Sequence, residues 1–256
     1  MKHNITTFAA ITAFALCGII FWETGFVWAV LAVIFIAYLA ATSYGSFKIQ
    51  ANYFLKSINK GQRKSIALTF DDGPDPDTTP AILETLKQKN VKATFFVIGK
   101  KAEKYPELLR QIDEEGHIVG NHSYSHHYLI AFFSTEKLRK DIVRCNGIIT
   151  EAIGKPPRFF RPPFGVTNPR YATVLKELQL DCIGWSLRSF DTKAKNKYQI
   201  INKIISKLKS RDIVLLHDNL RVTADSLEDV IEHCLQKGVK IEPLSRLIQK
   251  EPYDKI

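Results

Sequence analysis

Three histidines lie within six residues in the segment NHSYSHH, which runs from Asn121 to His127. His122 and His126 are four residues apart, a spacing at which two imidazoles can bind one metal ion from a helical turn or a tight loop. A surface pair or a capped pair of histidines has the same spacing. The segment therefore indicates a metal site only if another ligand reaches the same point.

Candidate ligands occur in the segment TFDDGP, where the adjacent carboxylates Asp71 and Asp72 end an apolar run. Two like charges this close raise one pKa unless a cation binds one of them. A metal held by one carboxylate would leave the other available as a base. An ordinary turn is the alternative, because Asp, Gly and Pro all favour turns. Two histidines with one aspartate describe hydrolytic zinc sites and non-haem Fe(II) oxygenases alike.

Two further motifs contain side chains that suit a catalytic site. In RPPFG, two prolines stiffen the loop after Arg161, whose guanidinium can bind a carboxylate through two hydrogen bonds. In IVLLHD, His217 follows a fully apolar run. A surface arginine on a structural loop and a core histidine are the alternatives. At the carboxyl end of a barrel strand, however, a histidine more often belongs to the site.

The elements that must position these side chains form a regular pattern after residue 64. Short apolar runs alternate with segments of helical spacing, which predicts a parallel α/β fold. Polar residues follow the carboxyl ends of five runs, and a barrel gathers such ends on one face whereas an open sheet spreads them along a line. We therefore expect a barrel of seven units. The expected strands are 65–71, 93–98, 117–121, 158–161, 181–186, 212–217 and 240–243, and the expected helices are 79–89, 105–115, 135–153, 169–178, 199–208 and 226–236.

The first 46 residues carry almost no charge, although the whole chain has a net charge of +10. Two apolar runs, at 5–22 and 26–44, match the roughly 17–25 residues that a membrane span needs. We predict a membrane anchor of two transmembrane helices at 1–46, a basic connector at 47–64 and a soluble domain at 65–256. A cleaved signal peptide is the alternative for the first run, but a second apolar run follows it without the small residues of a cleavage site.

Charge and cysteine content argue against two other kinds of site. The lysines of the domain are scattered and not interleaved with aromatic residues, so we expect no nucleic-acid partner. Cys145, Cys182 and Cys234 are odd in number and far apart, which predicts neither a disulfide framework nor a CxxC metal site. No feature of the sequence indicates an oligomeric state.

Taken in order, TFDDGP, HSxxH, RPPFG and LLHD resemble the motifs of the polysaccharide deacetylases of the NodB-homology family, carbohydrate esterase family four. The resemblance extends from Ser65 to about Pro243. It implies a distorted (β/α)7 barrel, in agreement with the seven units counted above. It also implies a metal-dependent hydrolase that removes N-acetyl groups from an amino-sugar polysaccharide or oligosaccharide, which would be its partner.

The resemblance implies a role for each matching residue around the metal. Asp72, His122 and His126 would hold a divalent metal, with zinc expected first and cobalt or nickel as alternatives. Asp71 would be the general base for the attacking water. Arg161 would tether and orient this base.

The remaining matches concern the leaving group and the substrate. His217 would be the general acid that protonates the leaving amine, and Asp191 would orient it and raise its pKa. The backbone N–H of Phe164 would stabilise the oxyanion together with the metal. Leu216 would line the acetate pocket. His127 receives no role.

The chain departs from the family after Trp185, where the family has Asp-x-x-Asp-Trp and this sequence reads RSFDT. The first aspartate is replaced by Arg188 and the tryptophan by Thr192, while the second aspartate is Asp191. This alters the wall of the substrate groove. Trp185 or Phe190 can take over the stacking surface.

Two other functions stay open at this point. The first is a membrane-tethered glycan-binding pseudoenzyme that keeps the barrel without turnover. The second is a deacylase of a lipid-linked amino sugar, which the two expected spans motivate. The side of the membrane is also open. Basic residues after the second span place the domain in the cytoplasm by the positive-inside rule, whereas the usual substrates of the family lie outside.

Overall fold

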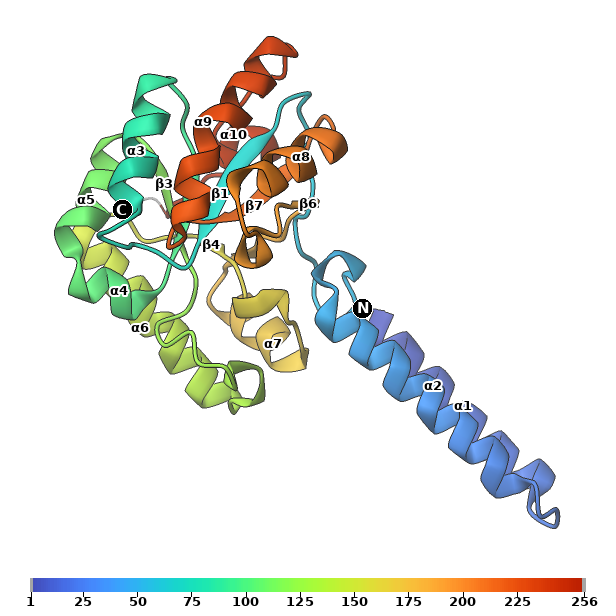
Figure 1. Cartoon of the computed structure of the whole chain (residues 1–256). Coiled ribbons are helices and arrows are strands. Elements are labelled where there is room, and N and C mark those ends of the chain that lie inside the picture. The colour runs from blue at the N-terminus through green and yellow to red at the C-terminus, as the bar shows by residue number, and fades with distance from the viewer. Residues whose placement is uncertain (1, 255–256) are drawn as a thin grey trace.

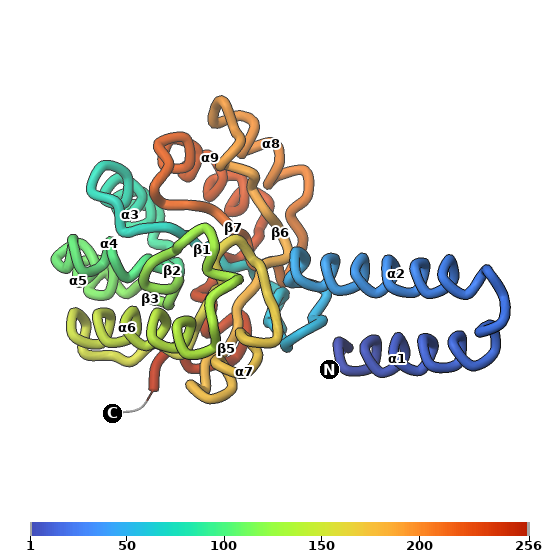
Figure 2. Tube along the Cα trace, turned by 90° about the horizontal axis from the view of Figure 1, so that it is seen from below, coloured from blue at the N-terminus to red at the C-terminus, as the bar shows by residue number. Residues whose placement is uncertain are grey.

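The structure, a computed structural model, describes residues 2–254. It consists of a pair of apolar helices and an α/β domain (Figure 1). The helices α1 (Lys2–Phe21) and α2 (Val27–Phe47) run antiparallel side by side and project away from the domain (Figures 1 and 2). With 20 and 21 residues, both are long and apolar enough to cross a membrane, and few of their residues are buried. The two apolar helices expected from the sequence are therefore present.

Seven strands form one parallel sheet in the described part of the chain, with the order β5-β4-β3-β2-β1-β7-β6. The strands are β1 (Ala67–Asp71), β2 (Thr94–Val97), β3 (Ile118–Asn121), β4 (Phe159–Phe160), β5 (Asp181–Cys182), β6 (Leu187–Arg188) and β7 (Ile213–His217). The parallel α/β fold expected from the alternation of elements is confirmed.

The sheet curls into a distorted barrel, because one stretch of chain joins its two edges. β5 and β6 lie at opposite edges, yet only residues 183–186 separate them in the sequence. The N–H of Ile183 donates to the carbonyl of Phe160 on β4 (2.8 Å), and the N–H of Ser186 donates to the carbonyl of Ile213 on β7 (3.1 Å). The chain thus passes from β5 at one edge of the sheet to β6 at the other. In the described chain, no strand ladder joins β5 to β6.

The seventh strand is not the one expected from the sequence. In the described chain, residues 240–243 form no strand, and only Ile241 makes an isolated bridge with Ile66. Pro243, which has no N–H to give to a ladder, instead precedes helix α10 (Leu244–Ile248). The expected strand at 181–186 is reduced to β5 (181–182), and β6 begins directly after the expected segment, at Leu187. The count of seven strands is right, but one member of the set is different.

Helices surround the barrel (Figures 1 and 2). They are α3 (Thr79–Gln88), α4 (Gly99–Lys104), α5 (Pro106–Glu114), α6 (Thr135–Ile153), α7 (Pro169–Glu177), α8 (Lys197–Lys207) and α9 (Arg221–Gln236), together with α10 and the 3-10 turns η1 (Ile49–Ala51), η2 (Ile130–Phe132), η3 (Pro163–Gly165) and η4 (Asp191–Lys193). All six expected helices are present, although α9 begins five residues before the expected 226. The sequence did not predict α4, whose six residues lack an apolar period.

Alternation along the strands separates the core from the inside of the barrel. In β1, Leu68 and Phe70 are buried in the core beneath the surrounding helices, so Thr69 and Asp71 belong to the opposite face. The register of β1 and β7 pairs Asp71 with His217. These two side chains therefore project side by side from the carboxyl edge of the sheet.

The segment between α2 and β1 packs against the domain. Ile49 and Leu55 are buried in the same cluster as Phe160. Ile58 forms a parallel bridge with Ile183 on the segment that joins the barrel edges. The helix pair is thus joined to the barrel by packed chain.

Candidate active site

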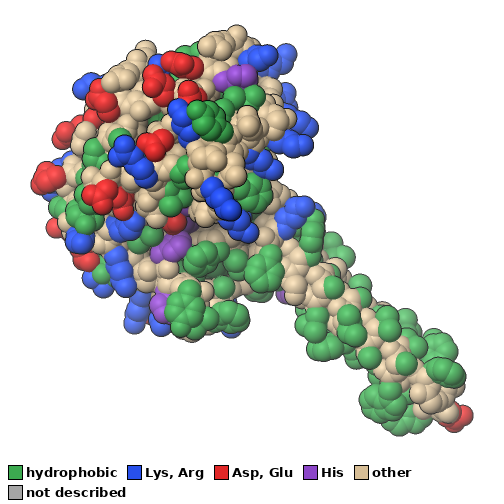
Figure 3. All heavy atoms as spheres, in the orientation of Figure 1, with side chains coloured by type: hydrophobic (Ala, Val, Ile, Leu, Met, Phe, Trp, Pro, Cys, Tyr) green, Lys and Arg blue, Asp and Glu red, His purple; other side chains and the backbone are tan. Residues whose placement is uncertain are grey.

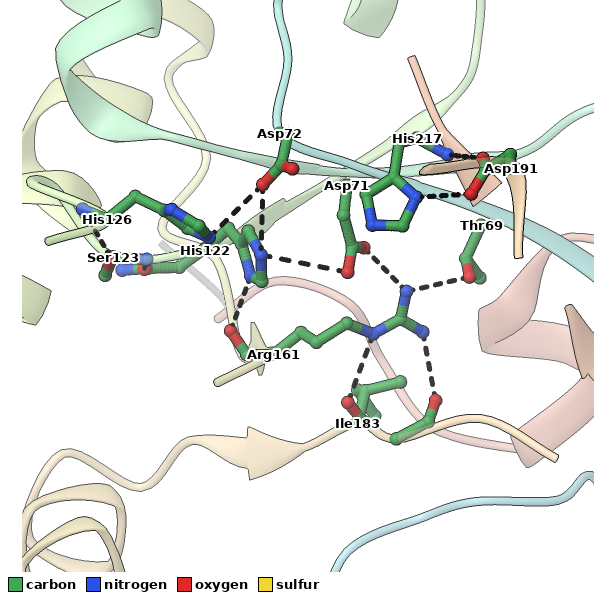
Figure 4. A network of polar contacts seen from close by, with 12 residues as sticks. Thr69, Asp71, Asp72, His122, Ser123, His126, Arg161, Ile183, Asp191 and His217 are labelled. Carbon is green, nitrogen blue, oxygen red and sulfur yellow. Dashed lines mark hydrogen bonds and ion pairs between the residues drawn. The ribbon is translucent and has the colours of Figure 1, made fainter. Parts of the chain in front are cut away.

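The carboxyl ends of four strands bring the motif residues together (Figure 4). Asp71 ends β1 and Asp72 follows it, while His122 follows β3. Arg161 follows β4, and His217 ends β7. This is the edge at which a barrel collects the polar side chains of its strand ends. The convergence expected from the sequence is therefore present.

Asp72, His122 and His126 form a candidate metal site. Asp72 Oδ1 lies 3.5 Å from His122 Nε2 and 3.3 Å from His126 Nε2, and the three ligand atoms lie within 4.8 Å of one another. Two ligands at the tetrahedral angle, each about 2.0–2.1 Å from a zinc ion, would lie about 3.3 Å apart. Asp72 Oδ1 is also buried without a hydrogen-bond partner, a costly state for a carboxylate oxygen that a cation would relieve. The residues present therefore fit a divalent cation.

The imidazole of His122 has the tautomer that metal binding needs. Its Nδ1 lies 2.7 Å from the carbonyl oxygen of Arg161, and because a carbonyl only accepts, Nδ1 carries the proton. Nε2 is left with the lone pair that faces Asp72. Burial, and next the neighbouring His126, lowers the pKa of His122 to about 3. The ring is therefore neutral near pH 7, which is the form that binds a metal.

Unfavourable backbone conformations occur in the loops that carry the candidate metal ligands. Asp72 (76°), Ser123 (69°) and His126 (42°) have positive φ there, and Phe164 (61°) has positive φ in the RPPFG loop. Such angles cost free energy in a residue other than glycine and are often found at functional sites. The Ser123 N–H donates to Asn121 Oδ1 (2.6 Å), and the His126 N–H donates to Ser123 Oγ (3.1 Å). These bonds hold the loop in the turn that directs His126 back toward Asp72.

Arg161 is completely buried beneath the site and binds Asp71. Its Nη1 donates to Asp71 Oδ1 (2.7 Å) and to Thr69 Oγ1 (2.8 Å). Its Nη2 and Nε donate to the carbonyls of Gly184 (3.0 Å) and Ile183 (3.3 Å) on the segment that joins the barrel edges. Burial raises the pKa of Asp71, and the charge of Arg161 opposes that shift. The guanidinium thus fixes the direction of the carboxylate.

His217 is held by a second buried carboxylate, Asp191. His217 Nδ1 lies 2.8 Å from Asp191 Oδ1, and the backbone N–H of His217 donates to Asp191 Oδ2 (2.7 Å). Burial lowers the pKa of His217, but the hydrogen bond and the charge of Asp191 outweigh it, so this pKa is raised above its ordinary value. Because Nδ1 is occupied, Nε2 is the ring nitrogen available to the site.

Asp71 lies between the candidate metal ligands and His217 (Figure 4). Its Oδ2 is 3.7 Å from His122 Nε2, and the ring of His217 lies on its other side. A carboxylate and an imidazole that flank one point can remove a proton from a water molecule and supply a proton to a leaving group. The arrangement suits a hydrolytic reaction.

Phe164 and Trp185 both border the site, but in different ways. The ring of Phe164 lies 4.7 Å from that of His126, centroid to centroid, and more than half of the side chain is exposed. Trp185 lies beneath the RPPFG loop, where a Cβ atom on Gly165 would approach Trp185 Cη2 to 2.3 Å. Gly165 is therefore needed for this close contact, and the loop covers much of the indole.

Leu216 does not face the site, contrary to the expectation from the sequence. It packs in the core beneath the helices with Phe70 and Leu227. Neighbouring residues of a strand point to opposite faces, so an inward His217 turns Leu216 outward. Leu215, which pairs with the inward Thr69, lies on the site's face of β7. We therefore correct the candidate pocket residue from Leu216 to Leu215.

The residues that depart from the family motif leave the contacts of Asp191 intact. The guanidinium of Arg188 lies 5.3 Å from the ring centroid of Phe190, and the backbone N–H of Thr192 donates to Asp191 Oδ1 (2.9 Å). Phe190 is partly exposed and can offer a stacking surface. His127 is exposed and lies outside the three candidate metal ligands.

Three residues that support the site were not identified from the sequence. Thr69 accepts a hydrogen bond from the buried arginine, Thr223 Oγ1 donates to Asp191 Oδ2 (2.9 Å), and Asp141 accepts backbone N–H groups of the histidine loop. Thr69 could have been found, because it lies two residues before Asp71 and so shares its face of the strand. Thr223 and Asp141 lie on helices and belong to no motif.

Comparison with known proteins places this chain in a described family. A family model for polysaccharide deacetylases matches residues 58–183. The chain is 35% identical over 191 residues to a peptidoglycan-N-acetylglucosamine deacetylase of Bacillus cereus, and the match covers 73% of this chain and 69% of that protein. It is 36% identical over 185 residues to the Bacillus subtilis peptidoglycan-N-acetylmuramic acid deacetylase PdaC, covering 72% of this chain and 39% of that protein. Among solved structures, the Bc1960 peptidoglycan N-acetylglucosamine deacetylase has a TM-score of 0.73 and 33% identity, with 77% of this chain and 94% of that chain covered.

Proposed function

Because this chain belongs to the polysaccharide deacetylase family, we propose that it hydrolyses N-acetyl groups of an amino-sugar polysaccharide or oligosaccharide in a metal-dependent reaction. The observation that carries the proposal is the position of Asp71 between three candidate metal ligands and His217. A base, a ligand set and an acid then surround one point, as hydrolysis of an acetamide requires.

Asp72, His122 and His126 would hold the metal ion. The observed separations of 3.3 and 3.5 Å between ligand atoms are close to the tetrahedral value for zinc, so we propose zinc, with cobalt or nickel as alternatives. When bound, the ion would act as a Lewis acid on the water and on the acetamide carbonyl.

Asp71 would be the general base. It takes one proton from the attacking water while the water oxygen forms a bond to the acetamide carbon. The buried guanidinium of Arg161 keeps Asp71 Oδ1 occupied, so Oδ2 is the oxygen left to receive that proton. Arg161 therefore acts as a positioning residue.

His217 would be the general acid. Its Nε2 donates a proton to the sugar nitrogen as the carbon–nitrogen bond breaks, which releases acetate and a free amine. Asp191 holds the ring through Nδ1 and favours the protonated form that can donate. The backbone N–H of Phe164 would stabilise the oxyanion, and Leu215 would line the pocket for the acetyl methyl group.

Replacing Asp191 by asparagine is expected to move the alkaline limb of the pH–activity profile to lower pH. His217 must be protonated to donate, and its protonated fraction falls as the pH rises through its raised pKa. Loss of the Asp191 charge lowers that pKa, so activity is lost at a lower pH than in the native enzyme. The profile of acetate release measures this shift. Asp229→Asn, at an exposed pair with Lys197, should leave the limb in place, and an unmoved limb in Asp191→Asn would contradict the role.

We propose that residues 1–46 anchor the protein in a membrane as a two-span protein, with spans at about 5–22 and 26–44, within or close to α1 and α2. Residues 47–64 would connect this anchor to the catalytic domain at 65–256. The helices support this assignment by length and composition. A reporter fused to the C-terminus will assign the domain to one side of the membrane.

The substrate class follows from the relatives, whose names specify N-acetylglucosamine and N-acetylmuramic acid of peptidoglycan. We propose an N-acetylated amino-sugar glycan of this kind. The test is acetate release by the full-length protein from peptidoglycan, from chitooligosaccharides and from lipid-linked amino sugars. Activity that a chelator abolishes and zinc restores is expected. Absence of acetate from all three substrates, with zinc bound, would overturn the proposal.

A glycan-binding protein without turnover is the second candidate. The replacement residues Arg188 and Thr192 favour it, because they alter the wall beside the site. The presence of Asp71, Asp191 and His217 argues against it, because binding of a glycan requires neither a general base nor a general acid. Binding of amino-sugar oligomers by zinc-loaded protein without release of acetate would identify this candidate.

A further inference from the structure

Four aromatic side chains are exposed on one rim of the domain beside the candidate active site. Phe47, Tyr128, Phe132 and Phe164 are exposed by 76%, 75%, 77% and 56%, and we call them the aromatic rim. A group of exposed large apolar side chains is unusual on a protein surface and marks a site of contact with another protein, a ligand or a membrane. All four remain largely exposed in the described chain, although the ring of Tyr128 stacks on His127 and that of Phe164 contacts His126.

These residues share one apolar groove of about 640 Å³, which also includes Val166. Phe47 is the last residue of α2, whereas Phe164 contacts the candidate metal ligand His126. The groove thus runs from the base of the helix pair to the mouth of the site. Because Phe47 belongs both to α2 and to the groove, the rim begins where the apolar surface of α2 ends.

Hydrogen bonds fix the base of α2 to the loop that carries Phe164. The Thr167 N–H donates to the carbonyl of Ser46 (3.0 Å), and Ser46 Oγ donates to the carbonyl of Thr167 (2.9 Å). A third hydrogen bond joins Thr167 Oγ1 to the carbonyl of Gly45 (3.3 Å). These hydrogen bonds therefore fix the position of the candidate active site relative to the end of α2.

The rim also lies on the side of the domain that would face a membrane holding α1 and α2. Figure 3 shows hydrophobic side chains gathered on the lower edge of the domain, the side from which the helix pair projects. Basic residues border the rim: Lys48 follows Phe47 in the sequence, and Arg170 lines the groove. Exposed aromatic residues next to lysine and arginine are typical of the bilayer interface, where anionic headgroups attract the cations.

We propose that the aromatic rim docks into the headgroup layer of the bilayer that holds α1 and α2. A bilayer is the occupant because the rim continues the surface of α2 and stands at its base, with cations at its border. The mouth of the active site then opens at the membrane surface, and the enzyme acts on amino sugars presented there. The inference rests on the membrane anchor proposed above.

The test uses the full-length protein in lipid nanodiscs that hold one copy each. Phe132→Cys, and as a second site Tyr128→Cys, are labelled with an environment-sensitive dye. The four native cysteines are buried and stay unlabelled. The expected result is a blue shift of the dye emission and quenching by lipids that carry bromine on the acyl chains. The matched control is Leu235→Cys, an exposed apolar residue near the end of α9 on the side away from the helix pair (Figure 1), and its dye should show neither effect.

An emission at Phe132→Cys and Tyr128→Cys equal to that of the control, in discs that retain the protein, would overturn the docking and leave the anchor intact. Failure of the protein to remain with the discs would overturn the anchor and the docking together. A shift that appears only with two copies per disc would assign the rim to a second copy of the chain. A shift that requires added polyprenyl phosphate would assign the groove to the lipid chain of a substrate. Either of these last results would also overturn the proposal.

Discussion

Replacing Asp71 by asparagine is expected to reduce acetate release by about 10²–10⁴-fold, the range typical of general acid–base catalysis. The amide keeps the size of the side chain and still pairs with Arg161, but it cannot take a proton from water. Asp72, His122 and His126 are unchanged, so the zinc content should stay at the native level. The measurement is the initial rate of acetate release together with metal analysis of the same preparation.

The stability of the variant separates a catalytic effect from a structural one. Asp71 is 4% exposed and bound to a fully buried guanidinium, so loss of its charge will also lower the free energy of unfolding. A thermal midpoint above the assay temperature shows that the folded enzyme is being measured. If the folded, zinc-loaded Asp71→Asn protein keeps more than about a tenth of the native rate, Asp71 is not the general base.

Replacing Asp72 by alanine is expected to weaken zinc binding by more than about 100-fold and to abolish activity at limiting zinc. Changes to the partners of metal ligands already cost about 10–100-fold in affinity, and Asp72 supplies a ligand itself. Its Oδ1 is the only atom of the set within 3.5 Å of both imidazole Nε2 atoms. Competitive titration with a chelator measures the affinity, and excess zinc should restore part of the rate.

The matched control for this variant is His127→Ala. His127 is next to His126 in the sequence but is exposed and lies outside the candidate metal site. Its zinc affinity and rate should equal those of the native protein. Native zinc affinity in Asp72→Ala would rule out the proposed ligand set, and a loss of zinc in His127→Ala would show that the histidine loop binds metal in another way.

The fold was largely predictable because apolar runs and helical periods are local properties. Six strands and six helices occupy the segments that the sequence indicated. The seventh strand was misplaced because its formation depends on a neighbour. In the described chain, residues 240–243 make a single β-bridge, between Ile241 and Ile66, whereas residues 187–188 pair with β7 after the chain has crossed the barrel.

The sequence also identified the residues that converge at the candidate site, since carboxylates, imidazoles and a guanidinium follow apolar runs at strand ends. It contained enough information to place Leu215, and not Leu216, on the side of His217, because alternation along a strand is local. It did not reveal Thr223 or Asp141, which act through hydrogen bonds to residues distant in the chain.

Only the tertiary structure decided which atoms face one another. Arg161 and Asp71 are 90 residues apart and meet because their strands end at the same edge of the barrel. The same packing gives His122 its tautomer through the carbonyl of Arg161 and places the site beside the base of α2. Residue types and order are properties of the chain, whereas distances between remote side chains exist only after the barrel has closed.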